Sequence, residues 1–136
     1  MNLSRILISF SISLMVFFAI DMLWLGLIAK DLYRRHIGHL MADQVRWSAA
    51  LLFYALYLIA LQYFVIQPAL HSSDPLQALI NGALLGLLCY ATYDLTNLAT
   101  LKNWPVSLSI IDMVWGTVLT GLTCWLTTLI SLRFFS

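Results

Sequence analysis

Four long apolar segments alternate with short polar ones along the chain. They cover residues 6–29, 48–66, 76–101 and 106–132. The second has no charged residue, and each of the others has one, in order Asp21, Asp94 and Asp112. A helix needs about 20 apolar residues to cross the ~30 Å hydrocarbon core of a membrane. The pattern therefore predicts an all-α, four-transmembrane-helix bundle in which residues 1–136 form a single polytopic membrane domain.

The connections carry ordinary helix-boundary signals. Asp74-Pro75 and Trp104-Pro105 place a proline at the start of a helix, where no N–H is needed, and Asp74 is the expected N-cap. Between the first two spans, apolar residues of segment 30–46 recur at helical spacing. This predicts a short amphipathic cytoplasmic helix whose Arg side chains face lipid phosphates. The same spacing also fits a simple extension of the first helix.

Composition narrows the class of protein further. Of the 136 residues, 62% are hydrophobic and 10% are charged, and the mean hydropathy is +0.90, whereas soluble domains are about a quarter charged. This excludes a disordered tail and a soluble enzyme, and the net charge of +1 excludes a nucleic-acid-binding protein. No Ala-x-Ala cleavage site follows Arg5, so the first span is predicted to be a retained helix rather than a signal peptide.

The positive charges predict the orientation of the bundle. Five of the seven Lys and Arg residues lie in the two loops on one side, and the other two lie near the chain termini. By the positive-inside rule, the basic loops face the cytoplasm and both termini face the opposite side. Arg5 favours the reverse orientation.

The three intramembrane acids are the strongest functional signal. A carboxylate at span depth costs at least ~2.5–3.5 kcal/mol to insert, so it usually faces the bundle interior and has a role. Asp21, Asp94 and Asp112 lie ~14, ~12 and ~10 Å from the cytoplasmic ends of their helices, at a rise of about 1.5 Å per residue. We therefore expect the three acids to share one layer of the bundle.

Other polar and aromatic residues accompany this layer. On the third helix Gly82, Gly86, Tyr90 and Asp94 recur every four residues and form one stripe, whose glycines let another helix approach closely. We expect a cavity with Asp94 as its central ligand. The predicted ligand-binding residues are Asp94, Asp21, Asp112, Tyr90, Tyr93, Asn97, Trp24 and Trp115. No residue is predicted to be catalytic.

A short internal repeat adds a geometric prediction. The sequence Ile-Asp-Met-Leu-Trp at 20–24 returns as Ile-Asp-Met-Val-Trp at 111–115. The two helices run in opposite directions, so Asp21 falls near the height of Trp115, and Trp24 near that of Asp112. If these helices are neighbours, we expect each indole N–H to donate to the facing carboxylate.

Three carboxylates placed this close together would repel one another. The four apolar segments contain no Lys or Arg to neutralise them. We therefore expect at least one to be protonated at neutral pH, or a cation to lie among them. The kind of metal or cofactor is left open. A structural alternative is that the acids are interhelical hydrogen-bond partners that contribute ~0.6–2 kcal/mol each.

Familiar catalytic and metal-binding motifs are missing from the sequence. It has no His-Glu-x-x-His, no Gly-x-Ser-x-Gly and no phosphate-binding glycine loop. His36 and His39 lack a Cys or Glu at metal-binding spacing and are interpreted as part of a solvated helix face. Cys89 and Cys124 differ by ~13 Å in depth, so no disulfide is expected between them.

The end of the third helix resembles a known bacterial family. Tyr-Asp-Leu-Thr-Asn-Leu-Ala-Thr-Leu-Lys at 93–102, followed by Trp104-Pro105, is similar to the predicted membrane proteins catalogued as domain of unknown function 2177. The similarity covers nearly all of the chain, including Asp21-x-x-Trp24, residues 37–40 and Asp112-x-x-Trp115. It implies a four-helix protein of the bacterial inner membrane, and the charge distribution then puts both termini in the periplasm. The resemblance implies no established activity or catalytic residues.

Three hypotheses of function follow. The leading one is a protein that binds or transports a small molecule or cation in a cytoplasm-side intramembrane cavity lined by the three Asp and aromatic residues. The second is a membrane-embedded enzyme that acts on lipid with one Asp as general acid or base. The third is an accessory subunit of a larger membrane complex. Expected partners are membrane lipids, a small molecule or cation, and further copies or other membrane subunits, but no nucleic acid.

Overall fold

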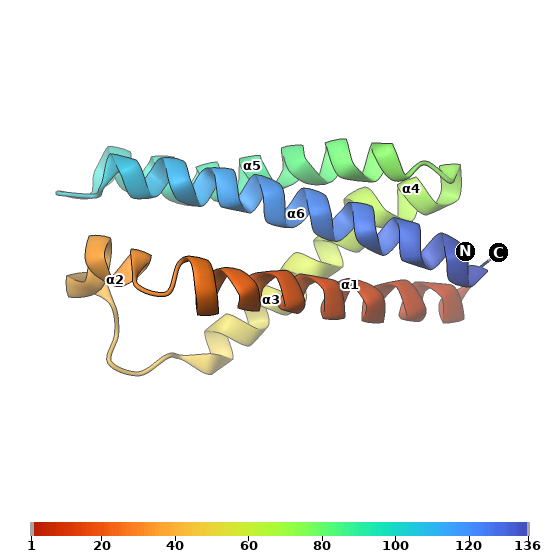
Figure 1. Cartoon of the computed structure of the whole chain (residues 1–136), viewed down its shortest axis with the longest axis horizontal. Helices are drawn as coiled ribbons and strands as arrows, with labels where there is room; N and C mark the ends of the chain where they lie inside the picture. The colour runs from red at the N-terminus through yellow and green to blue at the C-terminus, as the bar shows by residue number, and fades with distance from the viewer. Residues whose placement is uncertain (1, 136) are drawn as a thin grey trace.

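Four long helices make up most of the computed structural model, which describes residues 2–135 (Figure 1). The segments Leu3–Ile28, Trp47–Ser72, Pro75–Thr100 and Val106–Phe135 are each long and apolar enough to cross a membrane. No strand occurs in the described part of the chain. The predicted all-α architecture with four membrane-spanning helices is therefore confirmed.

The helix bounds differ from the predicted spans by a few residues, most of all in the second span. The elements are α1 (Leu3–Leu23), η1 (Trp24–Ile28), α2 (Leu32–Ile37), η2 (Gly38–Leu40), α3 (Trp47–Leu61), η3 (Gln62–Ile66), α4 (Gln67–Ser72), α5 (Pro75–Thr100) and α6 (Val106–Phe135). The π-helical turn η3 comes just before Pro68, which has no N–H to donate. The helix therefore continues past Pro68 instead of ending near the predicted boundary. Asp74 caps α5 as predicted, since its Oδ1 accepts from the backbone N–H of Gln77 at 3.2 Å.

The segment between the first two spans folds as a separate short helix, not as an extension of the first. α2 begins at Leu32 after a turn at residues 29–31. Arg34 and Arg35 are exposed, and the predicted contact of these arginines with lipid phosphates stays a prediction. His36 is partly buried, and its Nε2 lies 3.2 Å from Ser107 Oγ on α6. This short helix is therefore docked on the start of α6.

Helices α5 and α6 make the most extensive contact in the bundle. A Cβ added at Gly82 would lie 2.9 Å from the Cβ of Cys124, and one added at Gly86 would collide with the carbonyl oxygen of Gly116. The predicted close approach of another helix to the Gly82 and Gly86 face is thus made by α6 of the same chain. Both glycines are buried, so this face is not free to pair with a second copy.

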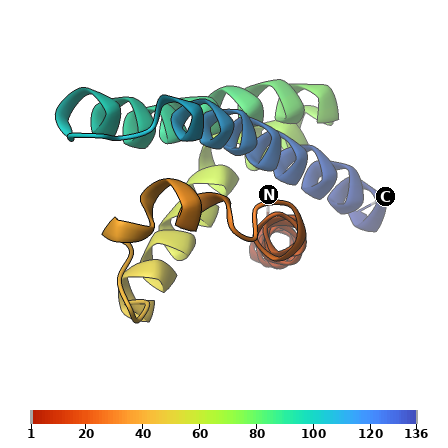
Figure 2. The same cartoon turned by 60° about the vertical axis from the view of Figure 1, so that its left-hand side comes forward.

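Helix α3 crosses the bundle obliquely, as Figures 1 and 2 show. Its C-terminal half is packed into the core, where Leu58 and Leu61 are fully buried. Its N-terminal half leans away, and Leu51 and Leu52 are exposed. The bundle is therefore loosely closed between α3 and α5 near the end that carries α2 and the α5–α6 turn, which we call the basic end.

An aromatic layer lies about halfway along the bundle. On α1, two serines, Phe17 and Asp21 occupy successive turns at four-residue spacing, so Phe17 separates two polar levels. Its buried ring lies 5.8 Å, centroid to centroid, from the rings of both Tyr54 and Tyr57 on α3. On the side of the layer towards the chain termini, a hydrogen-bonded cluster joins α1 to the second span through Ser9, Ser13, Gln62 and Gln67.

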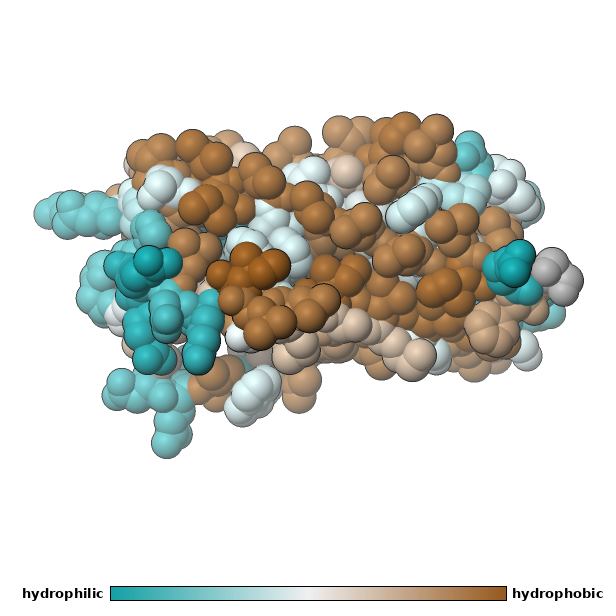
Figure 3. All heavy atoms as spheres, viewed as in Figure 1, coloured by the Kyte–Doolittle hydropathy of each residue, from teal (hydrophilic) through white to brown (hydrophobic). Residues whose placement is uncertain are grey.

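The surface agrees with a membrane location. A broad band of apolar side chains covers the middle of the molecule, and hydrophilic ones gather mainly at the basic end (Figure 3). The chain termini lie together at the opposite end (Figure 1). The surface between the polar ends is thus covered by apolar side chains that hydrocarbon can solvate.

Candidate ligand-binding site

The three intramembrane acids come from three different helices and are all buried. The exposed fraction is 6% for Asp21 on α1, 0% for Asp94 on α5 and 6% for Asp112 on α6. The carboxyl groups of Asp94 and Asp112 are close enough to interact electrostatically. Asp21 and Asp112 both interact electrostatically with the hydroxyl group of Tyr90. The structure therefore brings the acids into one region of the bundle interior.

This acid layer is not arranged as a metal centre. Among residues 2–135, no group of three or more His, Cys, Asp or Glu side chains converges closely enough to hold a metal ion. The carboxylates are instead dispersed around aromatic side chains.

Asp112 is held by a tyrosine from the short loop helix. The hydroxyl of Tyr33 donates to Asp112 Oδ1 at 2.7 Å, and the indole Nε1 of Trp24 donates to the Tyr33 oxygen at 3.1 Å. Burial raises the pKa of Tyr33 well above its usual value; the hydrogen bond from Trp24 opposes this shift, and the charge of Asp112 adds to it. Tyr33 therefore stays neutral and acts as the donor in this chain of three groups.

The two predicted Asp–Trp pairs are wrong. Trp24 and Trp115 stack on each other with ring centroids 4.4 Å apart and planes 8° from parallel. Trp24 donates to Tyr33 rather than to Asp112, and the Trp115 indole has no hydrogen bond to any described residue. The heights of the residues were suitable, but stacking aligns the two indole rings with each other. The Tyr33 hydroxyl then occupies the position beside Asp112.

Of the other two acids, Asp21 has one long hydrogen bond and Asp94 has none. Tyr54 donates to Asp21 Oδ2 over a long 3.5 Å. Neither carboxyl oxygen of Asp94 has any hydrogen-bond partner, although the side chain is fully buried. The side chain of Asn97, one turn along α5, is partly buried and also makes no hydrogen bond to a described residue. Asp94 is therefore the acid without a hydrogen bond in the described chain, and its electrostatic neighbour is the carboxyl group of Asp112.

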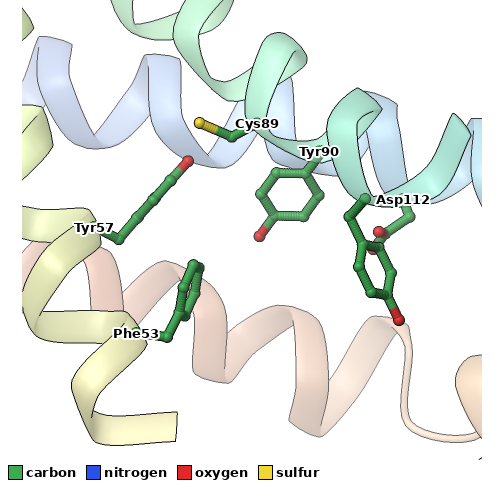
Figure 4. Close-up of a pocket in the computed structure, with 6 residues that line it drawn as sticks. Phe53, Tyr57, Cys89, Tyr90 and Asp112 are labelled. Atoms are coloured by element: carbon green, nitrogen blue, oxygen red, sulfur yellow. The ribbon is translucent and has the colours of Figure 1, made fainter. Parts of the chain in front are cut away.

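A cavity of about 240 Å³ lies beside the acid layer, between α3 and α5 (Figure 4). It is lined by Phe53, Tyr57, Cys89, Tyr90, Tyr93 and Asp112. The hydroxyl of Tyr57 is hydrogen-bonded to Thr120. The hydroxyl of Tyr90 points into the space between α5 and α3 and has no hydrogen-bond partner in the described chain (Figure 4). A ligand in this cavity would find the carboxylate of Asp112 and the unpaired hydroxyl of Tyr90.

Three of the eight predicted ligand-binding residues line this cavity, namely Tyr90, Tyr93 and Asp112. Asp94 and Asp21 lie behind it in the acid layer, and Asn97 lies a turn beyond Asp94. The remaining two, Trp24 and Trp115, line a separate, shallow groove with four aliphatic residues of α6. The structure thus divides the predicted set between the cavity, the groove and positions that line neither of them.

The predicted set omitted three cavity-lining residues, Phe53, Tyr57 and Cys89, and it also omitted Tyr33. Phe53 is one turn from Tyr57 on α3, so its helical spacing from that tyrosine was an available signal. Tyr33 offered no such signal, because its position depends on how the loop folds back over α6. The two free cysteines agree with the expectation of no disulfide, since Cys89 is exposed and Cys124 is buried.

The fold and the site together define a small four-helix membrane protein with buried acids beside an aromatic-lined cavity. The chain belongs to the family of predicted membrane proteins with domain of unknown function 2177 (DUF2177), which matches it over residues 6–129. No curated protein and no solved structure matches the chain significantly.

Proposed function

We propose that the protein binds or moves a small molecule or cation in the cavity beside the acid layer. The observation that carries this proposal is the buried, unpartnered carboxyl group of Asp94. A buried polar atom without a partner costs about 1–3 kcal/mol, and more when it is charged. Asp112 lines the cavity and interacts with Asp94, so a ligand bound at Asp112 would recover part of that free energy.

The roles of the residues follow from their places around the cavity. Asp94 is the central acid, and Asp21 and Asp112 are its partners. Tyr90 and Tyr93 line the cavity and orient the ligand. Asn97 extends this polar surface along α5, and the stacked pair of Trp24 and Trp115 forms the wall behind Tyr33.

The setting of this function is the bacterial inner membrane, with the basic loops in the cytoplasm and both termini in the periplasm. A single four-helix bundle is small for a transporter, so a homo-oligomer or a larger membrane complex surrounded by lipid is the working unit. The Gly82 and Gly86 face is already used by α6, so such an assembly forms through other faces.

Thermal unfolding of the purified protein in nonionic detergent tests the proposal. Wild type and Asp94→Asn are screened against divalent cations, small organic compounds and lipid extracts. A ligand at a hundredfold excess over its Kd should raise the wild-type Tm by about 5–10 °C, and Asp94→Asn should lose this shift. Asp43→Asn, at an exposed loop position, is the matched control and should keep it.

A different result of the same screen would reject the binding proposal. If no compound shifts the Tm and Asp94→Asn is as stable as wild type or more so, the acids are hydrogen-bonding residues between helices, and the binding proposal is rejected.

One observation favours a second candidate, an enzyme that acts on lipid. Three of the cavity-lining residues, Phe53, Cys89 and Tyr93, are exposed, so the cavity opens sideways towards the surrounding lipid. An acid reached from the bilayer could serve as a general acid or base. In this case, membranes from cells without the protein would show a changed lipid profile, and Asp94→Asn would not restore it.

A further inference from the structure

We infer that the cavity between α3 and α5 takes an organic ammonium ion that carries no phosphate group. This inference rests on the proposed function and names its ligand class. It is drawn from the chemistry of the cavity wall, the charges around it, and its size and opening.

The cavity wall is mostly aromatic. Four of its six lining residues carry rings: Phe53 and Tyr57 on α3, and Tyr90 and Tyr93 on α5. The ring centroids of Phe53 and Tyr57 are 5.3 Å apart on one side of the cavity, and the ring of Tyr90 lies on the other side (Figure 4). The faces of aromatic rings attract quaternary ammonium groups through the ring quadrupole, and such groups are commonly bound in small spaces surrounded by several rings.

The charges around the cavity select a cation and reject an anion. Asp112 supplies a carboxylate at its wall, and Asp94 and Asp21 lie close behind. No Lys or Arg lines the cavity. A phosphate-bearing headgroup would place its negative charge beside these acids with no positive side chain to compensate it. The site therefore disfavours phospholipid headgroups, including zwitterionic ones, and favours a simple ammonium ion.

The size and opening of the cavity set the shape of the ligand. Its volume of about 240 Å³ is below the ~300–1,000 Å³ of sites for drug-sized molecules. The exposed fractions of Phe53 and Tyr93, 50% and 53%, place its mouth on the lipid-facing surface. The occupant is thus the size of a headgroup. It is either a free ammonium ion or the head of a single-chain ammonium amphiphile whose tail stays in the bilayer.

Calorimetric titration of the full-length protein in a maltoside detergent tests this inference with matched probes. Choline is compared with 3,3-dimethyl-1-butanol, which has the same shape without the charge. Hexyltrimethylammonium represents the amphiphile. Choline should bind at least about 10-fold more tightly than its neutral analogue. A further gain for hexyltrimethylammonium identifies the bilayer as the source, and equal affinity identifies the free ion.

Two substitutions at one position separate the ring from the hydroxyl group. Tyr90→Phe keeps the ring and should lose less affinity for choline than Tyr90→Leu, which should lose about 5- to 30-fold. Asp112→Asn should lose about 30-fold or more, because it removes the carboxylate of a buried charge pair. The comparison of choline with its neutral analogue on wild type needs no variant, so a variant that fails to fold does not weaken the test.

Different experimental results would contradict this inference and the proposed function. If the neutral analogue binds as tightly as choline, or if Tyr90→Leu binds as well as Tyr90→Phe, the ammonium assignment is wrong. An Asp94-dependent Tm shift with some other compound would then still support the proposed function. If neither ammonium ion binds and no screened compound shifts the Tm, both are overturned.

Discussion

At the scale of single residues, the cavity depends on one glycine as much as on the acids. The ring of Tyr90 lies directly on the backbone of Gly116 in α6, where any Cβ would overlap its ring carbons. This contact holds the Tyr90 side chain at the wall of the cavity while α5 and α6 stay close together. Gly116 is therefore a positioning residue for the ligand site.

Gly116→Ala should displace the Tyr90 ring. Because the added methyl group has no free space, we expect a loss of about 1–3 kcal/mol in the free energy of unfolding, measured by denaturant titration in detergent. Gly26→Ala is the matched control, since nothing lies within 4 Å of its added Cβ. It should be neutral or stabilise the helix by up to ~1 kcal/mol. Equal effects of the two substitutions would contradict the assigned contact.

At the scale of elements, the short helix α2 closes the acid layer from the basic end. Tyr33 connects it to Asp112, and His36 connects it to Ser107. Both contacts reach the first turns of α6, so α2 and α6 are fixed to each other although 68 residues of chain separate Ile37 and Val106. Loss of Tyr33 should loosen this contact and expose Asp112.

The pH dependence of stability reports this contact. The folded protein favours the neutral form of Tyr33, so its pKa is higher in the folded than in the unfolded state. Its contribution is complete below the unfolded pKa of about 10 and is lost as the pH rises above that value. Tyr33→Phe should therefore lower the Tm at neutral pH and show a smaller fall than wild type between neutral and strongly alkaline pH.

A control is available at an exposed tyrosine of the second span. Tyr63→Phe changes a side chain that is 73% exposed and should leave both the Tm and its pH dependence unchanged. If Tyr33→Phe behaves like Tyr63→Phe, the bond to Asp112 contributes nothing to stability.

The spans and the acid layer could be predicted from the sequence because both depend on additive quantities. Hydropathy sums along a segment, and a constant rise per residue converts Asp21, Asp94 and Asp112 into depths. The contacts between particular side chains cannot be obtained from such sums along the sequence. The lean of α3, the return of Tyr33 and the stacking of two indoles depend on packing between helices, so the partners of Tyr33 and Trp24 could not be predicted from the sequence.

At the scale of the whole molecule, the distribution of charge predicts how the bundle lies in the membrane. The basic end carries α2 and the α5–α6 turn, and the chain termini lie at the opposite end. The positive-inside rule then puts the basic end in the cytoplasm.

Labelling of single cysteines with a membrane-impermeant maleimide tests this orientation. In a background without Cys89 and Cys124, Ser4→Cys should react in intact cells with a permeable outer membrane. Asp43→Cys should react only after the inner membrane is opened. The reverse pattern would contradict the predicted orientation, and partial labelling of both positions would indicate dual topology.

The aromatic layer around Phe17 separates binding in the cavity from passage along the bundle. The acid layer lies on one side of it, and the cluster of Ser9, Gln62 and Gln67 lies on the other. A ligand can therefore reach equilibrium in the cavity while the Phe17 ring stays in place. Passage to the termini side requires that ring to move out of its contacts with Tyr54 and Tyr57. A receptor needs only occupancy of the cavity, whereas a carrier would also need the buried core around Phe17, including Leu58 and Leu61, to rearrange.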